Sequence, residues 1–249
     1  MDRTAKAREW VEKMAMRVNP ADIERLSRAM LDSIDRVSNS RWELAVTRAA
    51  ELPGDVRPEK LKALTDSFAR ELGAVGAGVG ATAATPLIGT GVTLLAATAE
   101  IAWFTARAGD LVLTVAALHG RSSPSVAERR AWMLAVLIYG SSARDGLAAA
   151  INQSNTGLST ASDATRLPMA SLNAVNRLLV PQLMRRYGSR RGAIALGTAL
   201  PLGVGALVGG SANYMAMRSL ARNADRLFAR LPYSAIDTTA TEVGGVLAG

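Results

Sequence analysis

The sequence predicts an all-α protein, a multi-helix bundle with two apolar helical hairpins rich in glycine and alanine. Two segments, 73–99 and 192–217, hold no charged residue. The charged regions around them place apolar residues at the spacing of one helix face. Only 4% of the residues are aromatic although 49% are hydrophobic, so we expect a core of small aliphatic side chains that lets helices pack closely.

The first sixty residues are typical of amphipathic helices. Apolar side chains recur among charges at Ile23, Leu26, Met30 and Ile34. Pro20 suits a first helical position, because the backbone N–H that proline lacks would have no partner there. We therefore expect a helix that begins at Pro20.

Prolines and glycines mark further helix ends. Pro53 and Gly54 end one helix, and Pro58 opens the next. Pro86 divides the first uncharged segment into two helices, since proline breaks a helix interior. The helix after Pro86 is expected to close at Gly120, because glycine is the usual residue beyond a helix end.

The residue pattern in the second half of the chain predicts two basic helices. Ser125 and Glu128 have the spacing of a capping box at a helix start. Residues 141–166 are rich in Ser, Thr, Asn and Gly and predict a loop. Basic helices are predicted at about 168–187 and 218–231, on either side of the second uncharged segment.

These signals divide the chain into three parts. Residues 1–60 form N-terminal amphipathic helices, residues 61–231 form a helical domain that includes the predicted loop, and residues 232–249 form a flexible C-terminal tail. The charged N-terminus does not resemble a secretory signal. The expected location is therefore the cytoplasm.

Each uncharged segment fits two environments. About 20 apolar residues suffice to span a bilayer, so both segments are long enough. Each also contains one proline and six glycines, which weakens the tendency to insert. The segments therefore fit either membrane-inserted hairpins or tightly packed hairpins in the core of a soluble protein.

Arginines flank the second uncharged segment on both sides. Each Lys or Arg close to an anionic membrane contributes about 1 kcal/mol to binding. The candidate lipid headgroup contacts are Arg185, Arg186, Arg190, Arg191, Arg218 and Arg222. The net charge of +8 agrees with a phosphate-bearing partner. Nucleic acid is the rival partner, but no groove-reading element can be named.

A few polar residues interrupt or border the apolar stretches. The candidate buried polar or cavity residues are Glu100, Arg107, Asn213 and Tyr214. A buried carboxylate must pair, protonate or face a polar cavity. We therefore expect Glu100 either in a functional role or in an ion pair, with Arg107 on the same helix face or with Arg222 if the two hairpins pack together. Asn213 and Tyr214 fit a hydrogen-bonded pair or a cavity lining.

The sequence indicates no catalytic, metal or cofactor site. The absence of cysteine removes thiolate ligands and Cys nucleophiles. His119 is the only histidine, and we expect its ring to bind the last carbonyls of its helix rather than to act as a base. We therefore expect no enzymatic activity and no cofactor.

Three blocks of residues are similar to those of one bacterial family. The first runs from the Gly-rich stretch through Pro86 to Gly120, and the second is Pro124 with Glu128 and Arg129. The third consists of Asn176, Arg177, Leu178, Pro201, Gly205, Gly209, Gly210, Asn213, Tyr214, Arg218, Ala221 and Ala224. These blocks, spanning roughly 61–231, resemble the EcsC family. The resemblance implies an all-helical, membrane-associated or cytoplasmic protein with no established reaction or cofactor.

Two functions follow from these patterns. The first is a non-enzymatic protein that docks on or inserts into the cytoplasmic face of an anionic membrane through Gly-rich apolar hairpins with arginine collars. The alternative is a soluble all-helical module that binds a protein, a second copy of itself, a lipid or a small ligand. Nucleic acid is not an expected partner.

Overall fold

The computed structural model describes residues 20–82, 90–122, 124–154, 169–187 and 206–231. The secondary structure of these ranges consists of helices and the connections between them, with no strand, so the all-α prediction is confirmed. The elements are α2 (Pro20–Ser40), α3 (Trp42–Glu51), α4 (Arg57–Thr82), α5 (Thr90–Leu118), α6 (Val126–Tyr139), the 3₁₀ turn η1 (Gly140–Ser142), α7 (Ala143–Gln153), α8 (Met169–Tyr187) and α10 (Ala206–Arg230).

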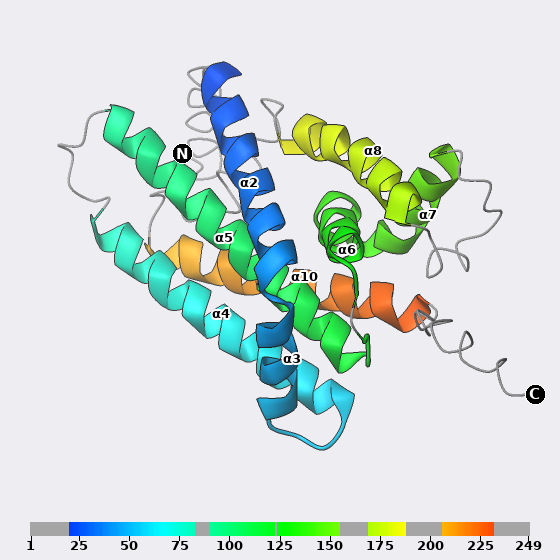
Figure 1. The fold of residues 1–249 in the computed structure, drawn as a ribbon. Coiled ribbons are helices and arrows are strands. Elements are labelled where there is room, and N and C mark those ends of the chain that lie inside the picture. Colours follow the sequence, from blue (N-terminus) through cyan, green and yellow to red (C-terminus); the bar gives the residue numbers. More distant parts are fainter. Residues whose placement is uncertain (1–19, 83–89, 123, 155–168, 188–205, 232–249) are drawn as a thin grey trace, which may run out of the picture.

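Helix α5 is the centre of the bundle. It packs against α2, α3, α4, α6 and α10. Figure 1 shows α2 crossing α5, α4 lying beside α5, and α10 passing behind them along α4. Helices α7 and α8 pack on α6 and form the other side of the molecule. The last helix of the described residues, α10, packs mainly on α4 and α5, the two helices that contain the described parts of the first uncharged segment.

The core is built mostly from aliphatic side chains, as the composition predicts. Leu111, Leu113, Leu134 and Leu179 are completely buried, and burying a leucine side chain contributes about 2 kcal/mol. Large rings are few. Trp132 packs edge-on against the ring of Phe228 with centroids 5.1 Å apart.

The predicted helix ends of α4 and α5 are confirmed. Gly54 has a φ of +112° and precedes α4. At the end of α5, Gly120 has a φ of +71°, a conformation that glycine adopts without steric cost. The N–H of Gly120 donates to the Ala117 carbonyl at 2.9 Å and the N–H of Arg121 donates to the Ala116 carbonyl at 3.2 Å. This pair of bonds is a Schellman motif, which satisfies carbonyls that the helix leaves free.

Helix α6 begins at the predicted capping box. The N–H of Glu128 donates to Ser125 Oγ at 3.2 Å, and the N–H of Ser125 donates to Glu128 Oε2 at 2.7 Å. The two side chains thus satisfy amides that have no partner inside the helix.

The loop predicted for 141–166 is wrong over its first half. Ala143–Gln153 forms α7, preceded by the 3₁₀ turn η1. Leu147, Ala150 and Ile151 lie at helical spacing and are buried, so packing outweighs the polar composition from which the loop was predicted. The remainder of the predicted loop, 155–166, lies outside the described residues, as do 1–19 and the predicted tail at 232–249.

The first uncharged segment forms parts of two packed helices. Residues 73–82 end α4 and residues 90–99 begin α5, and the two helices contact each other. This arrangement confirms a helical hairpin, although Pro86 itself lies outside the described residues. For the second segment only 206–217 are described, and they form the first half of α10.

Two stretches are long and apolar enough to cross a membrane by length and composition. They are Ile101–Leu118 in α5 and Val126–Gln153, which runs from α6 through η1 into α7. Most of Ile101–Leu118 is buried by neighbouring helices, and Gly140 interrupts the second stretch at the end of α6. Both stretches allow membrane association, and both also contribute side chains to the hydrophobic core of the bundle.

Gly146→Ala is expected to destabilise the protein by about 2 kcal/mol, the usual cost of overpacking. A methyl group at Gly146 in α7 would overlap the ring of Tyr139 in α6, and the Tyr139 hydroxyl donates to Gln182 of α8. This cost exceeds the roughly 1 kcal/mol that alanine gains over glycine in a helix. Urea denaturation measures the change.

The Tyr139→Ala background supplies the control for this substitution. Without the ring, Gly146→Ala should become neutral or stabilising. Equal destabilisation in both backgrounds would mean that the two residues do not compete for the same space.

Candidate functional site

The described parts of both uncharged segments lie at one end of the bundle. α10 runs beside α4 in the opposite direction, so its first turns lie near the last turns of α4 (Figure 1). The start of α5 lies at the same end. The start of α4 and the ends of α5 and α10 lie away from it. The molecule therefore has an apolar, glycine-rich end and an opposite, charged end.

Helix α10 carries a row of exposed arginines directly after its uncharged half. The row consists of Arg218, Arg222, Arg226 and Arg230. Residues four apart lie on one side of a helix, so the four guanidinium groups follow one side of α10. Only Arg218 and Arg222 were predicted as headgroup contacts, although the spacing of four residues would have identified the other two. We call these four residues the α10 arginine row.

The other predicted headgroup contacts are only partly described. Arg185 is exposed on α8, which packs on α6 and has no extensive contact with α10 among the described residues. Arg190, Arg191 and the side chain of Arg186 lie outside the described residues. The structure therefore supports a basic surface on α10 and does not bring Arg185 onto it.

Arg107 lies in a partly buried ion-pair network that joins α4 to α5. Its Nη1 donates to Asp110 Oδ2 at 2.9 Å, and its Nη2 donates to Glu71 Oε2. The guanidinium lies 4.6 Å from the centroid of the Phe68 ring, a favourable cation–π position. Arg41 Nε lies 3.9 Å from the other oxygen of Asp110. Arg107 therefore holds two helices together inside the bundle.

The partners of Arg107 were not expected from the sequence. Glu71 lies on another helix, 36 residues away along the chain, whereas Asp110 follows Arg107 by three residues, a spacing that could have indicated the pair. The side chain of Glu100 is outside the described residues, as are those of Asn213 and Tyr214. Their predicted roles stay predictions.

The predicted role of His119 is wrong. Its ring binds side chains rather than helix carbonyls: Nε2 lies 2.9 Å from Asp225 Oδ1, and Nδ1 lies 3.5 Å from Arg57 Nη1. These partners fit a neutral ring that donates from Nε2 and accepts at Nδ1. Burial lowers the pKa of His119 below its usual 6.5, and the nearby Arg57 and Arg121 lower it further, whereas Asp225 opposes this shift.

Arg121 caps the end of α10. Its Nη2 donates to the carbonyls of Phe228 at 3.2 Å and Leu231 at 2.6 Å. Basic side chains satisfy the last carbonyls of a helix and interact favourably with its negative end. Together with the His119–Asp225 bond, this cap attaches the end of α5 to the second half of α10.

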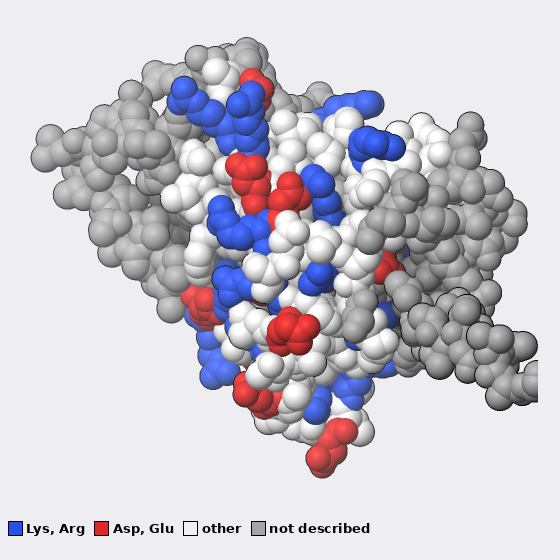
Figure 2. Space-filling view, in the orientation of Figure 1, with Lys and Arg blue, Asp and Glu red and all other residues white. Residues whose placement is uncertain are grey.

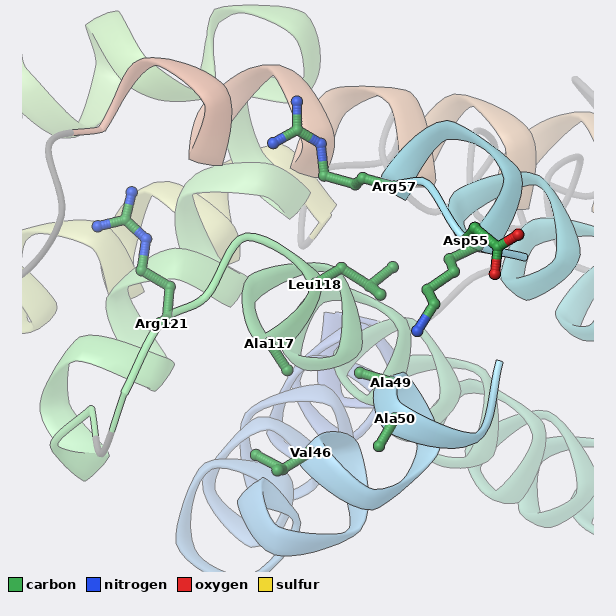
Figure 3. Close-up of a pocket in the computed structure, with 9 residues that line it drawn as sticks. Val46, Ala49, Ala50, Asp55, Arg57, Ala117, Leu118 and Arg121 are labelled. Carbon is green, nitrogen blue, oxygen red and sulfur yellow. The ribbon is translucent and has the colours of Figure 1, made fainter. Parts of the chain in front are cut away.

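A pocket opens beside these groups. Figure 3 shows Ala117 and Leu118, at the end of α5, between Val46, Ala49 and Ala50 of α3 on one side and Arg57 on the other. The complete lining is Val46, Ala49, Ala50, Asp55, Arg57, Lys60, Ala117, Leu118 and Arg121. Its volume is about 390 Å³. This site was not predicted from the sequence, because its lining brings α3 and the start of α4 together with the end of α5 and Arg121 beyond it.

No protein-family model, curated protein or solved structure matches the chain. The resemblance to the EcsC family therefore stays a prediction. Within the described ranges, no three His, Asp or Glu side chains are grouped so that they could hold a metal ion. The site must therefore be interpreted from its own charges and shape.

Arg107→Met is expected to destabilise the protein by about 3 kcal/mol, the usual cost of breaking a buried ion pair. The substitution leaves the carboxylate of Asp110, whose side chain is 3% exposed, without its closest cation. Arg70→Met on the exposed face of α4 should change the stability by less than about 0.5 kcal/mol. Urea denaturation compares the two variants, and equally small effects would contradict a structural role for the network.

Asp225→Asn is expected to lower the pKa of His119 further, because it removes the carboxylate that favours the charged ring. His119 is the only histidine, so its imidazole signals can be followed directly in an NMR titration. The exposed pair Lys62–Asp66 supplies the control, Asp66→Asn. A pKa that stays constant or rises in Asp225→Asn would exclude the His119–Asp225 bond.

The same pKa shift gives a pH dependence of stability. Because the folded pKa of His119 lies below the unfolded value near 6.5, the unfolded chain takes up the proton first as the pH falls. The contribution of neutral His119 is therefore fully present above about pH 6.5 and is lost as the pH falls through the folded pKa. His119→Gln should reduce this part of the pH dependence in urea denaturation.

Proposed function

We propose that the protein is a non-enzymatic, peripheral membrane protein that docks on the anionic cytoplasmic face of a membrane. The glycine-rich end contacts the lipid, and the α10 arginine row contacts the headgroups. The observation that carries the proposal is the continuity of α10, in which an uncharged half leads directly into exposed arginines. Membership of the EcsC family, proposed from the sequence blocks, agrees with this role.

The net charge of the chain is concentrated in one stretch of the sequence, which ends inside α10. Residues 164–224 hold eight arginines and no acidic residue. Their charge of +8 equals the net charge of the whole chain, so the rest of the protein is neutral overall. The arginines are Arg166, Arg177, Arg185, Arg186, Arg190, Arg191, Arg218 and Arg222. Net positive charge attracts a protein to an anionic surface.

The exposed side of α10 is positively charged. Asp225 is the only acidic residue of the helix, and its carboxylate is bonded to His119. Met215, whose side chain is 69% exposed, precedes Arg218 by three residues and so lies on the same side of α10. An exposed apolar side chain beside cations suits the boundary between headgroups and acyl chains.

A different face of the protein has mixed charges. Figure 2 shows acidic and basic side chains interspersed over the surface that α2 and α3 form. Exposed ion pairs such as Arg28–Glu24 contribute to this pattern. Mixed charge is typical of a solvated surface, so we assign the membrane contact to the α10 side rather than to α2 and α3.

Peripheral docking also fits the burial of α5. The stretch Ile101–Leu118 is apolar enough to span a membrane but is mostly buried inside the bundle. Spanning by this helix would remove it from α2, α3 and α10, whereas docking leaves the bundle intact. The alternative function, a soluble binding module, is favoured by the same burial and by the pocket beside Arg57.

Replacing Arg218, Arg222 and Arg226 together by Gln is expected to weaken binding to anionic vesicles about 100-fold, at about 1 kcal/mol per arginine. Flotation with vesicles of phosphatidylcholine and phosphatidylglycerol measures the bound fraction. Vesicles of phosphatidylcholine alone should bind the wild-type protein weakly. Added salt should weaken the anionic binding, because it screens exposed charges.

A matched variant tests whether vesicle binding depends on where the arginines lie or only on the net charge of the protein. Arg25, Arg28 and Arg36 are exposed on α2, and replacing all three by Gln removes the same charge from another face. This control should change vesicle binding by less than about fivefold. Equal losses in the two triple variants would contradict docking through the α10 arginine row, and strong wild-type binding to neutral vesicles would contradict docking by charge.

A further inference from the structure

The pocket beside Arg57 lies away from the glycine-rich end, the part of the protein that the proposed function places in contact with the lipid. It is formed at the start of α4 and the end of α5, whereas the glycine-rich segments lie at the opposite ends of these helices. Helix α4 has 26 residues, so its two ends are about 38 Å apart at 1.5 Å per residue. The pocket is thus a separate feature of the charged end.

The lining of the pocket combines positive charge with a small apolar surface. Arg57, Lys60 and Arg121 contribute three cations, against one carboxylate from Asp55. The rest of the lining is aliphatic and comes from Val46, Ala49, Ala50, Ala117 and Leu118. Ligand pockets commonly combine an apolar wall with a few polar groups that fix the orientation of the ligand. This lining is suited to an anion that also carries an apolar group.

Two of the three cations have contacts within the protein that hold their side chains in place. Arg121 is 6% exposed and is held by its two bonds to carbonyls at the end of α10. Arg57 lies against the ring of His119. Groups that are already ordered lose less conformational entropy on binding. The positive charge of Arg121, and in part that of Arg57, is therefore preorganised.

We propose that this pocket binds a small amphiphilic anion, a phosphate monoester or carboxylate with a short apolar group. The anionic group contacts Arg57 and Lys60, and Arg121 adds positive potential from the wall. The apolar group packs on the alanines of α3 and on Leu118. The volume of about 390 Å³ falls within the usual range for small-molecule sites, about 300–1,000 Å³.

His119 provides a direct readout of binding. Arg57 and Arg121 lower the pKa of His119, so an anion placed against them offsets part of their charge and raises that pKa. His119 is the single histidine of the chain. Its NMR titration therefore reports occupancy of the pocket without a label or an activity assay.

The test titrates inorganic phosphate and butyl phosphate into the full-length protein, with chloride at equal ionic strength as the reference. Both phosphates should raise the pKa of His119 saturably, and butyl phosphate should bind more tightly because its chain covers the aliphatic wall. Arg57→Gln and Lys60→Gln should each weaken butyl phosphate binding about fivefold, as expected for partly exposed ion pairs. Arg57→Gln also alters the His119 signal, so isothermal calorimetry supplies its affinity.

Lys62→Gln is the matched control. Lys62 is exposed on the same helix and pairs with Asp66 outside the pocket lining, so its loss should leave phosphate binding unchanged. Equal weakening in Lys60→Gln and Lys62→Gln, or a response no larger than that to chloride, would overturn the proposal.

A final comparison distinguishes a soluble ligand from a lipid headgroup. Arg57→Gln and Lys60→Gln should leave flotation with anionic vesicles unchanged, because neither residue belongs to the α10 arginine row or to the glycine-rich end. If these variants reduce flotation as strongly as they reduce butyl phosphate binding, the pocket holds a headgroup and the assignment to a soluble anion is wrong. Failure of the α10 variants to reduce flotation would affect only the membrane proposal.

Discussion

The packing of α10 against α4 and α5 determines which side of α10 faces solvent. Met217, Ala221, Ala224 and Phe228 of α10 are buried, and the alanines allow close approach of the neighbouring helices. The bond between His119 and Asp225 and the Arg121 cap fix the second half of the helix. With the apolar side of α10 buried in this way, its remaining side faces solvent, and that side carries the α10 arginine row. The same packing sets the position of α10 relative to the pocket.

This arrangement separates two kinds of surface. The described parts of the uncharged segments lie at one end of the bundle, and polar side chains gather at the other, where Arg57, His119 and Arg121 meet α10. A membrane docked at the first end leaves the pocket open to solvent. Because α10 takes part in both regions, it connects them physically. The proposed membrane contact and the proposed anion site can therefore operate in one folded protein.

Local features were predictable from the sequence, and distant contacts were not. The capping box of Ser125 and Glu128 and the glycine at Gly120 depend on residues within a few positions of each other, so their spacing alone predicted the helix ends. Helix α7 was missed because burial of Ile151 and its neighbours outweighs a polar composition. The His119–Asp225 bond joins residues 106 positions apart, and no local spacing indicates such a pair. The anion pocket was missed for the same reason, since it is assembled from three helices.

The most direct test of the account places a polarity-sensitive fluorophore at each end of the molecule. The chain contains no cysteine, so single substitutions Met215→Cys on α10 and Leu44→Cys on α3 can each be labelled uniquely; both native side chains are exposed. With anionic vesicles, the label at position 215 should shift its emission to shorter wavelength, whereas the label at position 44 should keep the emission it has in water. A blue shift at position 44, or no shift at position 215 in protein that floats with the vesicles, would contradict membrane contact through the glycine-rich end and the arginines of α10.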